Sequence, residues 1–180
     1  MPPWRSTLAA APRVKGRALC YTTRMAQAGF WAISSGKISF RGDGRWYNDE
    51  EPINNARIAK LFSKCLRQAD DGRWQIAMAD ERAFVDIQDT PWVVTSVSGD
   101  AARGFTVRLN DDSEEALDAS SLTVGEANVL YTRVKDGRYR ARFLRPAYYQ
   151  LAPAITERNG RFVLATAGRD HEIRPSKGAD

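Results

Sequence analysis

The chain has 180 residues, the length of one ordinary domain or two small ones, and its 43% hydrophobic and 27% charged residues are typical of a folded globular protein. Two cysteines and one histidine are too few for a disulfide framework or a histidine-based metal site, and the apolar runs fall far short of the roughly 18 residues of a membrane span. We therefore expect a soluble cytoplasmic protein with no metal or other cofactor.

The formal charge of +5 is concentrated at the N-terminus. Residues 1–42 hold seven of the 27 basic residues and no acidic residue, which leaves 20 basic against 22 acidic residues in the remainder. Residues 1–35 also lack a sustained apolar period, so we expect a basic, disordered N-terminal tail. The first 24 residues fit a targeting segment, a disordered arm or an extension upstream of a start at Met25.

Four turn motifs punctuate the rest of the chain. Each is an Asp-Gly or Asn-Gly pair followed by arginine and an aromatic residue, and they begin at Asp43, Asp71, Asp136 and Asn159. These dipeptides accept the positive φ angles of tight turns between antiparallel strands, so each motif predicts a β-hairpin. The alternative is that any β-rich protein uses such turns.

The spacing of the motifs favours a duplication. In each half a proline, Pro52 or Pro146, opens a helical pattern nine or ten residues after the first turn. The first helix should be capped by Asn54 or Asn55, with its apolar residues on one buried face. We predict an α+β protein made of β-rich, duplicated hairpin-helix-hairpin units.

We divide the chain into the tail of residues 1–35, a small β-rich domain with one helix at 36–89, and a second β-rich domain at 90–175. A domain of about 60 residues buries only about 60% of its unfolded surface, so the small domain should lean on its neighbour. The contact between them would form an inter-domain crevice, a common place for a ligand site.

Several segments in this order resemble the bacterial family called domain of unknown function 1285. The segments are GRWY at Gly44, EPI at Glu51, IAKLFS at Ile58, DGRW at Asp71, VDIQDTPW at Val85, LYTRVKDG at Leu130 and RPAYYQL at Arg145. The resemblance spans about residues 38–173. It implies a duplicated β-rich core, a second half superficially like pleckstrin-homology folds, and a role in signal transduction through a nucleotide-like ligand bound between the halves.

The hairpin around Asp136 brings like charges together. A two-residue turn pairs Arg133 with Arg140 and Tyr131 with Arg142 on one face, where opposed like charges are destabilising. A bound phosphate would relieve this repulsion, because the planar fork of arginine suits it. The alternatives are that the acidic loop of residues 111–118 neutralises the arginines, or that they extend into water.

The helix that should follow this hairpin adds further candidates. Proline at the first helical position leaves free amides beside Arg145, and two tyrosines follow. The alternative is that Arg145 pairs with a carboxylate and one tyrosine is core. The candidate ligand-binding residues are Arg133, Arg140, Arg142, Arg145, Tyr148 and Tyr149.

No catalytic motif is present, so we do not expect an enzyme. The segment Ser35-Gly36-Lys37 departs from a phosphate-binding loop because Trp31 stands where glycine is required. The favoured function is a cytoplasmic regulatory protein that binds an anionic, nucleotide-like small molecule at the inter-domain crevice. The alternatives are a protein interaction scaffold with complementary acidic and basic patches and, with less support, nucleic-acid binding through the basic tail.

Overall fold

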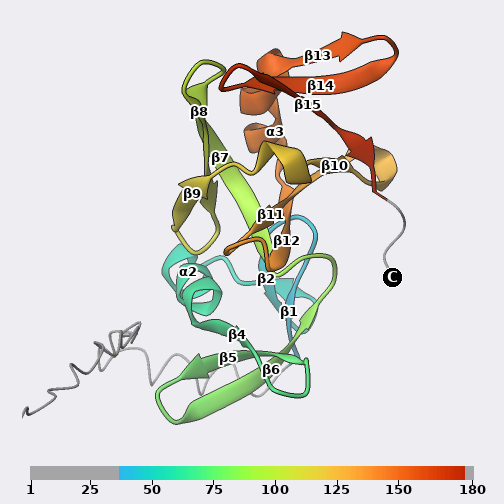
Figure 1. The fold of residues 1–180 in the computed structure, drawn as a ribbon. Coiled ribbons are helices and arrows are strands. Elements are labelled where there is room, and N and C mark those ends of the chain that lie inside the picture. The colour runs from blue at the N-terminus through green and yellow to red at the C-terminus, as the bar shows by residue number, and fades with distance from the viewer. Residues whose placement is uncertain (1–36, 177–180) are drawn as a thin grey trace, which may run out of the picture.

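The computed structural model describes residues 37–176, which form two β-rich parts stacked along one axis (Figure 1). The expectations for the tail of residues 1–35, and for a start at Met25, lie outside the described residues. Neither of the two α-helices in the described part is long and apolar enough to cross a bilayer.

The first part is a six-stranded sheet with one helix. Its elements are β1 (Ile38–Phe40), β2 (Trp46–Asn48), β3 (Glu51–Pro52), α2 (Ala56–Cys65), β4 (Leu66–Gln68), β5 (Trp74–Met78) and β6 (Glu81–Ile87). The strand order is β3-β2-β1-β6-β5-β4, and the parallel pair of β1 and β6 joins two antiparallel halves. The pairing of β1 with β6 therefore brings the beginning and the end of this part together in one sheet.

Of the two predicted caps of the first helix, Asn54 and Asn55, the structure has Asn55. Its side-chain oxygen accepts hydrogen bonds from the amides of Arg57 at 3.0 Å and Ile58 at 3.3 Å. These bonds satisfy donors that have no partner in the first turn. On the buried side of α2, the ring of Phe62 meets Trp46 edge to face, with centroids 5.6 Å apart. The cap and the apolar face thus fix both the start and the orientation of the helix.

The second part is a seven-stranded mixed sheet, a helix and a small antiparallel sheet. The large sheet contains β7 (Trp92–Asp100), β8 (Gly104–Leu109), β9 (Glu114–Ala116), β10 (Thr123–Val124), β11 (Leu130–Val134), β12 (Tyr139–Phe143) and β16 (Arg174–Pro175). Its order is β16-β10-β11-β12-β7-β8-β9. The other elements are η1 (Ala119–Ser121), η2 (Glu126–Asn128), α3 (Arg145–Leu151), η3 (Ala152–Ala154), β13 (Ile155–Arg158), β14 (Arg161–Thr166) and β15 (Arg169–Glu172).

All four turn motifs connect neighbouring antiparallel strands, as predicted. They join β1 to β2, β4 to β5, β11 to β12, and β13 to β14. The glycine of each motif has a positive φ, between 73° at Gly160 and 84° at Gly72. A residue with a Cβ rarely adopts this backbone conformation, which explains why glycine stands at this position of each motif.

The two hairpin pairs are assembled differently in the two parts. In the first part the second hairpin rejoins the first through the pairing of β6 with β1. In the second part β13, β14 and β15 form a sheet of their own, and β12 pairs instead with β7. The halves share an order of elements, but their strands are connected in different ways.

The hydroxyl of Ser63 on α2 holds the two parts together. It accepts hydrogen bonds from Nε1 of Trp46 at 2.9 Å and from Nδ2 of Asn110 at 3.1 Å, and donates to the carbonyl of Ala59 at 3.1 Å. Asn110, after β8, also accepts from the amide of Val93 at 3.1 Å. Ser63 is only 4% exposed and Trp46 is buried as well, so these two groups depend on each other for hydrogen bonds, while Asn110 is half-buried.

An aromatic cluster lies beside this hydrogen-bond network. Trp74 of β5 contacts both Trp92 and Tyr139 of the second part, with ring centroids 5.5 Å apart in each case. Trp74 also packs against the buried clusters of both parts. Trp74 therefore joins the two cores directly.

We expect the Ser63→Ala substitution to lower the free energy of unfolding by about 1–3 kcal/mol, because Trp46 would keep a buried donor, and Asn110 a half-buried one, without its acceptor. Urea denaturation followed by tryptophan fluorescence measures this change. Ser98→Ala, in the exposed part of β7, is the matched control and should leave the midpoint nearly unchanged. Equal midpoints for the two variants would show that the Ser63 hydroxyl does not stabilise the contact.

Candidate functional site

The arginines of the β11–β12 hairpin have the predicted register. Arg133 lies opposite Arg140, and Tyr131 lies opposite Arg142. The residues that alternate with them point into the core of the second part, where Val134 and Ala141 are buried. The three arginines and Tyr131 therefore share the face of the sheet that turns away from this core. We call these three arginines the arginine row.

Arg142 is bound by a carboxylate from the segment that joins the two parts. Its Nη1 donates to Oδ2 of Asp89 at 2.8 Å, and the hydroxyl of Tyr131 donates to the same oxygen at 3.1 Å. Asp89 lies between β6 and β7, and a Cβ placed on Gly42 of the β1–β2 turn would lie 3.0 Å from Nη1 of Arg142. Arg142 thus reaches the place where the first part meets the second.

Burial raises the pKa of Tyr131, and the negative charge of Asp89 and the hydrogen bond to it raise the pKa further. Burial in a region of low dielectric disfavours the charged phenolate, and so does a neighbouring carboxylate. At neutral pH Tyr131 therefore remains a neutral phenol, and its hydroxyl donates a hydrogen bond to Asp89.

Arg140 lies flat on the ring of Tyr131. Its guanidinium carbon is 3.6 Å from the ring centroid, which is the geometry of a cation–π contact. Within residues 37–176, no carboxylate forms an ion pair with Arg140 or Arg133. The side chain of Arg133 donates to the carbonyl of Gly137 at 3.3 Å, at the tip of the hairpin. One carboxylate therefore serves a row of three arginines.

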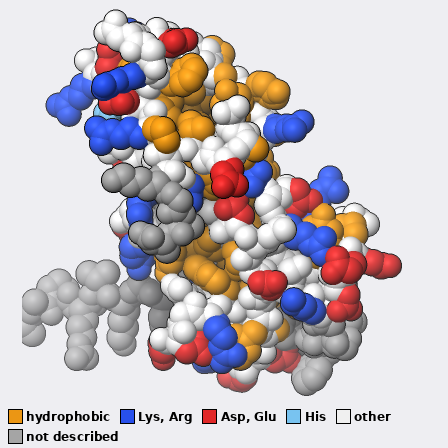
Figure 2. All heavy atoms as spheres, turned by 90° about the vertical axis from the view of Figure 1, so that its right-hand side faces the viewer, with side chains coloured by type: hydrophobic (Ala, Val, Ile, Leu, Met, Phe, Trp, Pro, Cys, Tyr) orange, Lys and Arg blue, Asp and Glu red, His pale blue; other side chains and the backbone are white. Residues whose placement is uncertain are grey.

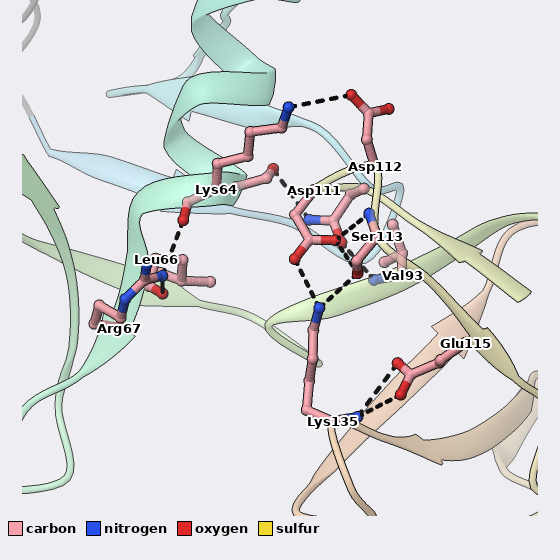
Figure 3. A network of polar contacts seen from close by, with 11 residues as sticks. Lys64, Leu66, Arg67, Val93, Asp111, Asp112, Ser113, Glu115 and Lys135 are labelled. Atoms are coloured by element: carbon pink, nitrogen blue, oxygen red, sulfur yellow. Dashed lines mark hydrogen bonds and ion pairs between the residues drawn. The ribbon is translucent and has the colours of Figure 1, made fainter. Parts of the chain in front are cut away.

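The acidic loop does not neutralise the arginine row. Asp111 instead accepts from Nζ of Lys135 at 2.8 Å, and Ser113 accepts from the same ammonium at 2.6 Å (Figure 3). Glu115 accepts from the backbone amide of Lys135 at 3.0 Å. Asp112 pairs with Lys60 of α2 at 2.9 Å. The loop fixes the tip of the hairpin and α2, so the alternative in which these acids neutralise the arginine row is not found.

The partner that the sequence analysis missed is Asp89. Its pairing with Arg142 spans 53 positions of the chain, and no local pattern marks such a contact. The stacking of Arg140 on Tyr131 could have been found, since the predicted register places the two residues on the same face, one strand apart. Only the identity of the carboxylate required the folded structure.

The remaining candidates lie elsewhere. Helix α3 packs through Ala147 and Leu151 into the same core as Ala141, so it lies on the other side of the sheet from the arginine row. Arg145 at its start is exposed, and no ion pair reaches it within the described residues. Tyr148 and Tyr149 are 39% and 67% exposed, with ring centroids 5.7 Å apart. The structure does not bring these three residues to the arginine row, and their part in ligand binding stays a prediction.

The fold is thus that of a β-rich α+β protein, with two α-helices and three sheets in the described part. No protein-family model and no curated protein matches the sequence.

Two solved structures have a similar fold, and both are described as DUF1285 family proteins. The one from Silicibacter pomeroyi DSS-3 is 20% identical with a TM-score of 0.59, and the match covers 76% of this chain and 79% of that one. The one from Shewanella baltica OS155 is 17% identical with a TM-score of 0.51, covering 67% of this chain and 93% of that one. The resemblance to domain of unknown function 1285 is therefore confirmed at the level of the fold.

The Asp111 to Lys135 ion pair predicts a dependence of stability on pH. Burial alone would raise the pKa of Asp111, but the hydrogen bonds from Lys135 and Ser113 outweigh it and hold the pKa below its ordinary value of 3.8. A carboxylate with a lowered pKa adds stability that is complete above the unfolded value and is lost as the pH falls through the folded value. The stability that this pair adds should therefore begin to fall near pH 4 and be lost as the pH is lowered further.

We expect Asp111→Asn to lower the free energy of unfolding at pH 7 by about 1.5–3 kcal/mol, because Lys135 loses its anionic partner. Between pH 5 and pH 2, the variant should also lose stability less steeply than the parent. Urea denaturation across this range measures both effects. Asp136→Asn makes the same change at a side chain that is 94% exposed, and should match the parent in both respects. If Asp111→Asn lost stability between pH 5 and pH 2 as steeply as the parent, the Asp111 to Lys135 pair would not be the source of this pH dependence.

Proposed function

We propose that this is a cytoplasmic regulatory protein that binds an anionic, nucleotide-like small molecule at the arginine row. The observation that carries the proposal is the imbalance of charge on this face. Arg133 and Arg140 are directly opposed across the hairpin, and Asp89 is bound to the third arginine of the row. Like charges in this position are destabilising, and a phosphate would offset the repulsion.

The arginine row is also partly preorganised. Arg142 is held by Asp89, and Arg140 rests on the ring of Tyr131. Side chains whose conformations are already fixed lose less entropy when a ligand binds. The free edge of the Arg140 guanidinium is suited to two parallel hydrogen bonds with one phosphate group.

The position of the row supports a regulatory role. Asp89 belongs to the segment between β6 and β7, and Gly42 belongs to the first part. A ligand that changed the contact of Arg142 with Asp89 would act on the junction of both parts. We propose that ligand binding is coupled in this way to the relative position of the two parts, as a signalling protein requires.

We also propose that the two parts arose by duplication and that the second resembles a pleckstrin-homology domain. The shared order of hairpin, helix and hairpin supports a duplication, after which the second copy changed its strand pairing. A second half that is superficially similar to a pleckstrin-homology domain would fit the role of the mixed sheet as a ligand-binding platform.

Nucleic-acid binding has less support. Figure 2 shows acidic and basic side chains interspersed with hydrophobic ones over one face, with no continuous basic surface on it. Non-specific binding to nucleic acid depends mainly on contacts between many cations and phosphates. A small anion can be bound by two or three arginines and does not require a continuous basic surface.

A ligand panel tests the proposal through thermal melting. Nucleoside mono-, di- and triphosphates and cyclic dinucleotides are compared with uncharged nucleosides. At 100 times its dissociation constant a ligand stabilises the fold by about 2.7 kcal/mol, which corresponds to a rise in Tm of about 5–10 °C. We expect such a rise for at least one phosphate-bearing compound, and we expect salt to diminish it.

Arg140→Ala should abolish this rise while leaving the fold intact, because Arg140 contributes only its contact with Tyr131, about 0.5–1 kcal/mol. Arg103→Ala, at an exposed arginine in the β7–β8 turn, is the control and should keep the full rise. Arg142→Ala is less suitable, since it removes the partner of Asp89 and destabilises the protein by itself. Equal shifts for the parent and Arg140→Ala, or no stabilising nucleotide at all, would refute the proposal.

A further inference from the structure

The exposed side of α2 carries a row of positive charge that the proposed function does not use. The helix contains no acidic residue. Its three basic residues recur every three or four positions, which places them on one side of the helix, and a fourth lies just after the helix in β4; all four are exposed. We call them the α2 stripe: Arg57, Lys60, Lys64 and Arg67.

One carboxylate faces this stripe and is shared by three cations. Asp112 of the β8–β9 turn lies 2.9 Å from Nζ of Lys60, 3.5 Å from Nζ of Lys64 and 3.5 Å from Nη2 of Arg108. The hydrogen bond from Lys60 is the main reason that the pKa of Asp112 is lowered. Glu114 adds a longer contact of 3.8 Å to Arg108. Within the described residues, the four cations of the stripe and Arg108 of β8 therefore have two carboxylates between them.

The stripe is held in a fixed position. The opposite side of α2 is buried through Phe62, Ser63 and Cys65, and the Asn55 cap fixes the start of the helix. At its end, Arg67 donates to the carbonyl of Lys64 at 2.9 Å (Figure 3). Basic residues three and four positions apart on a helix repel each other, and α2 offers no acid to relieve this repulsion. An anionic partner would supply the missing negative charge.

We propose that the α2 stripe binds an acidic segment of a partner protein, in an extended conformation with carboxylates at alternate positions. From Arg57 to Lys64 the stripe extends about 10.5 Å along the helix at 1.5 Å per residue, and Arg67 lies beyond the end of the helix, in β4. Alternate side chains of an extended chain lie about 6.6 Å apart on the same side. Three such carboxylates would therefore extend along most of the stripe and meet Lys60 and Lys64 at its centre.

The stripe suits a peptide better than it suits other polyanions. Single-stranded nucleic acid binds by stacking its bases on aromatic side chains, but the aromatic residue of α2, Phe62, is buried. A membrane surface is held by basic residues together with an apolar face that enters the interface. The apolar face of α2 is instead packed in the protein core. The ammonium groups at the centre act as point charges that need no planar partner, so carboxylates satisfy them.

The test measures binding to a fluorescein-labelled peptide, Glu-Ser-Glu-Ser-Glu-Ser-Glu, by fluorescence anisotropy with the full chain. The same peptide with Gln in place of Glu should not bind. Raising the salt from 50 mM to 500 mM should abolish binding of the acidic peptide, because exposed ion pairs are screened. A single-stranded oligonucleotide of equal charge and vesicles of phosphatidylserine and phosphatidylcholine are measured in parallel.

Two sets of variants locate the site. Replacing both central lysines, Lys60→Gln with Lys64→Gln, should weaken peptide binding about tenfold. The control pair Arg103→Gln with Arg169→Gln removes the same charge elsewhere and should change binding less than about twofold. Asp112→Asn should strengthen binding about threefold, because it frees the cations that Asp112 now holds, whereas Asp80→Asn should not.

The variant results decide the proposal independently of the arginine row, which shares no residue with the stripe. A peptide that binds equally well to the double lysine variant would overturn it, and so would the absence of salt-sensitive binding. Binding of the oligonucleotide or the vesicles through these lysines, with no binding of the peptide, would show that the stripe serves a different polyanion and would equally overturn it. Tighter binding by Asp112→Asn together with weaker binding by the double variant would support the peptide.

Discussion

The buried hydroxyl of Ser63 links the core of the first part to the second part. It lies on α2, yet its two incoming hydrogen bonds come from Trp46, in the core of the first part, and from Asn110, in the second. A donor that loses water without gaining an acceptor is costly, so the amide of Asn110 depends on the first part being in place beside it. A part this small cannot bury a large core alone, and it completes its core with Val93 of the neighbouring sheet.

Charge is organised around this same contact. The acids of the β8–β9 turn reach in opposite directions, with Asp111 paired to Lys135 at the hairpin tip and Asp112 paired to Lys60 on α2. These pairs hold the hairpin and the helix against the turn. As a result the arginine row receives its single carboxylate from Asp89, and Arg140 keeps its charge unpaired within the described residues. In the described part of the chain, the arginine row is thus left with the carboxylate of Asp89, and the α2 stripe with that of Asp112.

The recurring turn motif shows how one local sequence acquires different roles. The aromatic residue of the first motif, Trp46, is buried in the first core, while Trp74 and Tyr139 meet where the two parts join. Phe162, from the fourth motif, is 55% exposed. The turn forms in every case because glycine adopts a positive φ regardless of its surroundings. The fate of the aromatic side chain depends on what packs against its strand.

Local sequence was enough to predict the four turns, a cap of α2 at Asn54 or Asn55 and the register of Arg133 opposite Arg140. Each depends on backbone conformation, capping or strand alternation within a few residues, and these operate before any distant segment is in place. The pairing of Arg142 with Asp89, 53 positions away, and the place of α3 across the sheet from the arginine row came from the packing of the whole fold. Such contacts depend on which segments the packed cores bring side by side, and ion pairs between distant charges leave no periodic signal in the chain.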